Sequence, residues 1–230
     1  MNDRLERRRS CLALAAVVAV ALAPTARAAN TVLNPNFNAD VSFWNTFLSG
    51  ISDTDPLAFG SAMHTNAQDV DGIAPASGAV AVTLDGTGGQ PKAAAGARQC
   101  VDLGQPAPTV TEANYGARFK IPGANASDAS VNVSVEIRFY SDAGCTTFIP
   151  GAGGVQGRNI GIGVPDDAFW YAAADGHFIP PPGTVARSAE VRAGLRRVTG
   201  SAAAYTGFFD NVYLSLNGTT PVSLQQFQVD

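Results

Sequence analysis

Residues that could carry acid–base or metal chemistry are few and widely spaced in this chain. Of 230 residues only His64 and His177 are histidines, and neither has the H-x-H or H-E-x-x-H spacing of a zinc site. No serine lies in a G-x-S-x-G sequence. A glycosidase needs two neighbouring carboxylates, and the sequence places no two of Glu112, Glu136 and Glu190 together. We therefore expect a protein that is not an enzyme.

The first 28 residues have the three parts of a secretory signal peptide. Four arginines between positions 4 and 9 precede an apolar run over 11–23, and Ala26-Arg27-Ala28 provides a small-residue cleavage site. No segment reaches the run of about 18 apolar residues that a transmembrane helix requires. We expect cleavage after Ala28 and a secreted protein, extracellular or periplasmic, with no membrane span.

The charge balance excludes two classes of partner. Removing residues 1–28 removes five of fifteen basic and two of nineteen acidic side chains, which leaves a net charge of −7. The longest basic run in the remainder is Arg196-Arg197. Binding to nucleic acid or to anionic lipid depends on clustered basic residues, so neither is expected.

Two cysteines, Cys100 and Cys145, remain after removal of the signal peptide. An even number of cysteines in an exported protein is typical of disulfide bonding. No C-x-x-C sequence or nearby histidine favours a metal site instead. The sequence therefore predicts one disulfide between these two residues.

Alternating apolar and polar residues predict strands. The clearest alternation covers 130–140, in which every second residue is Val, Ile or Phe and the residues between them are mostly polar. Shorter segments of the same kind are 78–84, 97–103, 114–121, 189–198 and 208–216. Turn residues separate them, whereas the Gly-rich stretch 151–163 is interpreted as a surface loop. This pattern predicts an all-β fold, a jelly-roll β-sandwich of two antiparallel sheets over residues 29–216, followed by a tail over 217–230.

Three groups of short motifs then suggest a family. They are Val32-Leu33-Asn34-Pro35-Asn36-Phe37 with Phe43-Trp44, the central stretches 99–101 and 139–145, and the closing stretches 186–192 and 208–214. Together they resemble the bacterial carbohydrate-binding modules of the cellulose- and xylan-binding jelly-roll type, in the galactose-binding-like superfamily. Those modules open with an N-x-x-F-E…W strand and close with an F-D-D-V-x-L strand. This chain has Asn38 in place of the glutamate and Asn211 in place of the second aspartate.

The resemblance implies a structural calcium where the first and last strands meet. Only Asp210 matches the family's carboxylate ligands, with Asn36 and Asn38 as further oxygen donors. Calcium prefers six to eight oxygens, several of them from carboxylates. The two amides therefore weaken this expected site.

The resemblance also implies aromatic platforms that stack on sugar rings. The candidate platforms are Trp170, Tyr171, Tyr140, Trp44 and Tyr115, although the family keeps the tryptophan at the position of Trp44 mostly buried. The expected function is non-catalytic binding of a polysaccharide or cell-surface glycan by a monomer. Two alternatives stay open: an extracellular structural or adhesion protein that uses the same fold against a protein surface, and a glycoside-cleaving enzyme.

Overall fold

The computed structural model describes residues 30–49, 60–70, 78–85, 94–123, 130–159, 169–198 and 204–218. The expected signal peptide and residues 219–230 of the expected tail lie outside these ranges. Within the described ranges every regular element is a strand, so none of them holds a helix that could cross a membrane.

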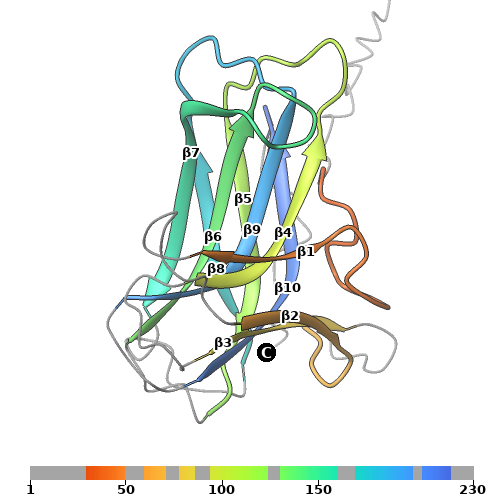
Figure 1. The fold of residues 1–230 in the computed structure, drawn as a ribbon, viewed down its shortest axis with the longest axis vertical. Coiled ribbons are helices and arrows are strands. Elements are labelled where there is room, and N and C mark those ends of the chain that lie inside the picture. The colour runs from red at the N-terminus through yellow and green to blue at the C-terminus, as the bar shows by residue number, and fades with distance from the viewer. Residues whose placement is uncertain are drawn as a thin grey trace, which may run out of the picture.

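Two antiparallel five-stranded sheets pack face to face (Figure 1). Sheet A contains, in spatial order, β1 (Asn45–Ser49), β4 (Ala94–Asp102), β9 (Ser188–Arg197), β6 (Val131–Tyr140) and β7 (Phe148–Asn159). Sheet B contains β2 (Gly60–Thr65), β3 (Ala79–Leu84), β10 (Tyr205–Leu216), β5 (Ala113–Lys120) and β8 (Tyr171–Phe178). The predicted all-β sandwich is confirmed.

Side-chain alternation explains how the core forms. In β6 the five apolar residues from Val131 to Phe139 are fully buried, while the residues between them are partly exposed. Successive side chains of a strand point to opposite faces, so one face of β6 enters the core and the other meets solvent. Large aromatic side chains from both sheets fill the space between them, among them Phe119, Phe139 and Phe209.

The interpretation of 151–163 as a loop was wrong for its described part, because residues 151–159 belong to β7. Neighbouring side chains already occupy the space beside these glycines. A Cβ added to Gly154 would lie 2.9 Å from the hydroxyl of Tyr115, and one added to Gly153 would lie 3.4 Å from the ring of Phe148. Close packing against Tyr115 therefore favours glycine at position 154 of this strand. The remaining residues, 160–163, lie outside the described ranges.

The opening and closing motifs meet, as the family resemblance implied. The backbone N–H of Thr31 donates to the carbonyl of Leu214 (2.9 Å), and that of Val212 donates to the carbonyl of Pro35 (3.0 Å). From sheet A, the buried side chain of Gln99 makes two hydrogen bonds with the backbone of Leu33 (2.7 and 2.8 Å). The N-terminal segment is thus attached to both sheets.

The predicted disulfide is present between Cys100 near the end of β4 and Cys145 in the loop after β6. Replacing both cysteines with alanine is expected to lower the free energy of unfolding by roughly 2–4 kcal/mol, because a 45-residue separation is no longer closed in the unfolded chain. Urea unfolding followed by circular dichroism measures this difference. Equal stability of the two proteins would show that the crosslink contributes nothing.

Tyr115 is buried in the core, which makes it unsuitable as a ligand platform. Burial, followed by the negative charge of Glu136, raises the pKa of its hydroxyl to about 12. The folded protein thus retains this proton above the ordinary tyrosine pKa of about 10, where the unfolded chain loses it.

Stability is therefore expected to fall as the pH rises from about 10 toward 12. Urea unfolding at a series of alkaline pH values measures the slope, and Tyr115→Phe should make it shallower. The same slope in both proteins would contradict this assignment.

Candidate functional site

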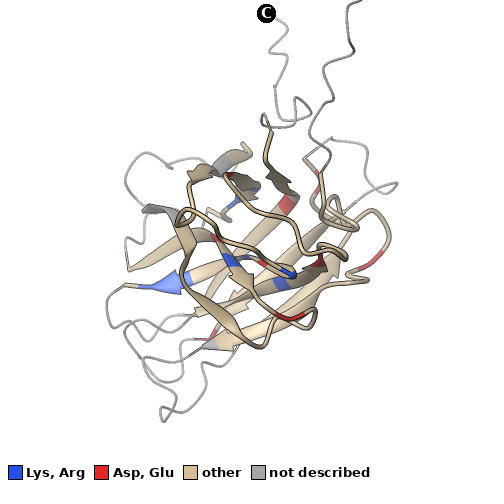
Figure 2. Ribbon diagram, turned by 90° about the horizontal axis from the view of Figure 1, so that it is seen from above, with Lys and Arg blue, Asp and Glu red and all other residues tan. Residues whose placement is uncertain are grey.

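The outer face of sheet A carries a concentration of charge. Charged residues are sparse over the described ribbon (Figure 2). The pairing of β4, β9 and β6 nevertheless brings five of them side by side on one surface. We call this set the arginine–glutamate network, and it consists of Arg98, Glu136, Arg138, Glu190 and Arg192.

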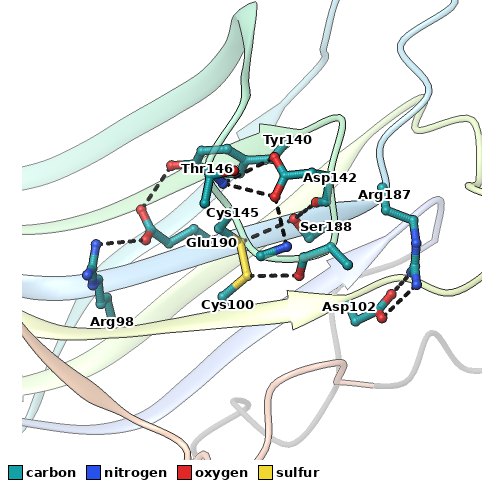
Figure 3. The surroundings of a disulfide bond; sticks show 12 residues. Arg98, Cys100, Asp102, Tyr140, Asp142, Cys145, Thr146, Arg187, Ser188 and Glu190 are labelled. Carbon is teal, nitrogen blue, oxygen red and sulfur yellow. Dashed lines mark hydrogen bonds and ion pairs between the residues drawn. A yellow bond between two sulfur atoms is a disulfide. The ribbon is translucent and has the colours of Figure 1, made fainter.

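Glu190 lies at the centre of the network. Its side chain is only 3% exposed, and it accepts hydrogen bonds from Arg98 (3.3 Å) and Arg192 (2.7 Å). The hydroxyl of Tyr140 donates a third bond to the same carboxylate (3.1 Å; Figure 3). A buried carboxylate costs free energy unless it is paired and hydrogen-bonded, so these donors fix its position.

The network continues from Arg192 to the solvent-facing side of β6. Arg192 lies 3.7 Å from Glu136, which accepts a 2.6 Å hydrogen bond from Arg138. Arg192 also lies over the ring of Phe47, 5.3 Å from its centroid. The side chains of Arg98 and Arg138 remain 45% and 37% exposed. Two guanidinium groups are therefore held in place while still open to a ligand.

Phe148 adds an exposed aromatic ring to this face. It is 44% exposed, and its ring packs edge-on to that of Tyr140 with centroids 5.9 Å apart. In the register of the sheet it lies opposite Tyr140, and an irregularity in the pairing separates this pair from Arg138 and Gly153. Sequence reasoning missed Phe148, because the adjacent glycines were interpreted as a loop. The short apolar run Phe148-Ile149 before Pro150 was the available signal.

A row of small residues crosses the sheet beside the network. Gly96 of β4, Gly194 of β9 and Ser134 of β6 lie opposite one another in register. Phe47 of β1 covers the first of them, since a Cβ on Gly96 would lie 2.5 Å from its ring. Small residues therefore border the arginines on β9 and β6, while the ring of Phe47 covers the end of the row on β4.

The structure does not bring the predicted aromatic platforms together. Tyr140 belongs to the face just described but is 4% exposed, and burial, followed by the charge of Glu190, raises the pKa of its hydroxyl. Tyr171 is the first residue of β8 in sheet B, and Trp170 directly precedes it. Tyr171 packs toward the core against Phe119 (centroids 5.8 Å apart), and Trp170 is partly exposed. Trp44 is 7% exposed, at the edge of sheet A.

The residues predicted for calcium do not fit such a site well. Asp210 is buried, and its two carboxylate oxygens accept backbone hydrogen bonds from Val70 (3.1 Å) and Asn211 (2.7 Å). In the described part of the chain no three His, Cys, Asp or Glu side chains gather as a metal site. With Asn36 and Asn38 as the further donors, calcium would have Asp210 as its one carboxylate, fewer than it prefers.

Two carboxylates do converge, since Glu136 and Glu190 both contact Arg192. Catalysis on a sugar requires a carboxyl group that reaches the substrate. Glu190 is enclosed by its three donors, and Glu136 is bound by Arg138. The two histidines lie elsewhere: His64 contacts the carbonyl of Phe37, and His177 pairs with Glu112. Both carboxylates are therefore held by arginine side chains.

The chain has no match among protein-family models or among curated proteins. Its fold does match solved structures. An arabinose-bound α-L-arabinofuranosidase covers 83% of this chain at 11% identity, with a TM-score of 0.52, and this chain spans only 27% of that enzyme. A Stig cyclase from Fischerella sp. TAU, in complex with an indole compound, covers 84% at 15% identity and a TM-score of 0.50, and 100% of the cyclase is matched.

A carbohydrate-binding module is among the weaker matches. A CBM22-1 xylan-binding domain from Paenibacillus barcinonensis covers 84% of this chain at 10% identity, with 98% of the domain matched and a TM-score of 0.46. Identities this low establish the fold alone. The chain thus has a β-sandwich of a kind found in proteins of several different activities.

Proposed function

We propose that this protein is a non-catalytic carbohydrate-binding module whose glycan lies across the outer face of sheet A. The observation that carries the proposal is the pairing of two exposed guanidinium groups with an exposed aromatic ring. Arg98 and Arg138 supply the first, and Phe148 supplies the second.

These groups suit the chemistry of a sugar. A guanidinium presents several N–H donors in one plane, which can bind two neighbouring hydroxyl oxygens at once. An aromatic ring packs against the apolar C–H face of a sugar. Because Glu136 and Glu190 already hold the arginines, little side-chain freedom is lost on binding. The face therefore provides pre-arranged donors beside an apolar platform.

Export is part of the proposal. The disulfide between Cys100 and Cys145 is of the kind that persists in oxidising compartments. The N-terminal sequence has the form of a signal peptide. A polysaccharide or a cell-surface glycan is a ligand that an exported protein meets.

A protein-binding role is the second candidate, and one feature of sheet B favours it. Its outer face includes Met63, 64% exposed, in register with Ala81 and Phe208 of the neighbouring strands. Thr83 and Thr206 follow in the next row. Such a surface of small and apolar residues fits a protein partner better than a sugar.

Retention of the protein on insoluble polysaccharides tests the proposal. Variants on the two outer faces show whether the ligand binds to sheet A or to sheet B. Arg138→Ala and Phe148→Ala are each expected to weaken retention by about tenfold, a loss of roughly 1.4 kcal/mol. Met63→Ala, which changes an exposed residue of sheet B, is the matched control and should bind as the unchanged protein does. Trp170→Ala tests the platform that the sequence suggested.

Loss of retention in Met63→Ala or Trp170→Ala alone would move the ligand to sheet B. Failure of the unchanged protein to bind any glycan would favour the protein-binding role. Release of reducing sugar from a retained glycan would contradict the non-catalytic assignment.

A further inference from the structure

A small pocket opens where the edge strands of the two sheets meet, beside the arginine–glutamate network, since its lining residue Asn45 lies opposite Arg98 in register. Its volume is about 150 Å³. The residues that line it come from the segment before β1, from β1 itself, and from β2 and β4: Val41, Trp44, Asn45, Thr46, Ala62 and Ala97. Trp44 was one of the aromatic residues singled out in the sequence.

The pocket exists because two alanines lie where larger side chains would close the gap. At Gly60 the sheets approach closely, since a Cβ there would lie 2.8 Å from the Cβ of Ala95. Two residues further along β2, Ala62 faces the pocket together with Ala97 of β4. The hydroxyl of Thr46, on the edge strand of sheet A, lies 3.5 Å from the carbonyl of Ala62, on the edge strand of sheet B. The pocket is therefore formed by residues of strands β1, β2 and β4 and not by a separate loop alone.

The lining combines apolar surface with uncharged polar groups. The indole N–H of Trp44 is already bonded to the carbonyls of Leu33 and Asn34 (3.1 Å each), so the ring offers the pocket only apolar surface. The exposed side chain of Asn45 makes no hydrogen bond within the described residues, and it can both donate and accept. Among the described residues that line the pocket, none is charged.

We propose that this pocket is a second binding site, which takes a single neutral sugar ring. The pocket is smaller than the roughly 300–1,000 Å³ of sites for drug-sized ligands, which limits the occupant to about one ring. The apolar walls meet the C–H face of the sugar, and Asn45 and Thr46 meet its hydroxyls. The described lining residues include no cationic side chain, which disfavours an acidic sugar.

The two tryptophans of the chain make a direct test possible. In a Trp170→Phe variant, Trp44 is the only tryptophan, and its fluorescence reports on the pocket. Titration with glucose, galactose, mannose, xylose and arabinose is expected to give a saturable change with at least one of them, with Kd on the order of 1 mM, and glucuronate should bind more weakly. No saturable change with any neutral sugar, or tighter binding of glucuronate, would overturn the proposal.

A variant that fills the pocket provides a second test, and a variant on a neighbouring strand is its matched control. Ala62→Leu in the same background should abolish the change, while Ala81→Leu, on the outer face of neighbouring β3, should leave it intact. A change that survives Ala62→Leu would place the sugar elsewhere. Should Ala62→Leu not fold, as judged by its thermal unfolding, Asn45→Ala replaces it, since this exposed residue is expected to weaken binding about tenfold.

This site borders the proposed glycan surface at Arg98, but variants can test the two separately. Ala62→Leu is expected to bind insoluble polysaccharide as the unchanged protein does, whereas Arg138→Ala should retain the fluorescence response of Trp44. Loss of both activities in Ala62→Leu would contradict a separate second site.

Discussion

The outer face of sheet A depends on a single buried carboxylate. Glu190 is nearly inaccessible, and a charge in that position requires several partners to offset the loss of water. Arg98, Arg192 and Tyr140 fill that role, which fixes their positions across β4, β9 and β6. Arg192 in turn contacts Glu136 and thereby links the network to Arg138. The arginines proposed to bind sugar are thus arranged before any ligand arrives.

The same strand alternation that builds the core also builds this surface. In β9, Val191 and Ala193 enter the core, while Glu190 and Arg192 point outward on the other face. A one-residue slip of register would move the charged residues into the core. The core residues and the network therefore specify the same register. The disulfide joins β4 to the loop after β6, at the end of the sheet where Tyr140 and Glu190 meet.

Much of the fold followed from the sequence, whereas the site did not. The alternation over 130–140 and the shorter alternating segments predicted six of the strands, and the even cysteine count predicted the disulfide. The strand over 148–159 was missed because its glycines are covered by side chains distant in sequence, such as Tyr115. Glu136 and Glu190 are 54 positions apart, and only strand pairing shows that both contact Arg192. Phe148 had no sequence signal beyond a short apolar run.

The account is tested most directly by mapping where an oligosaccharide contacts the protein. Backbone amide NMR signals, followed during titration with soluble cello- and xylo-oligosaccharides, locate the contact residue by residue. The account predicts shifts on β4, β6 and β9, centred on Arg98 and Arg138, with further shifts at Phe148. Shifts confined to the outer face of sheet B, around Met63 and Phe208, would contradict it.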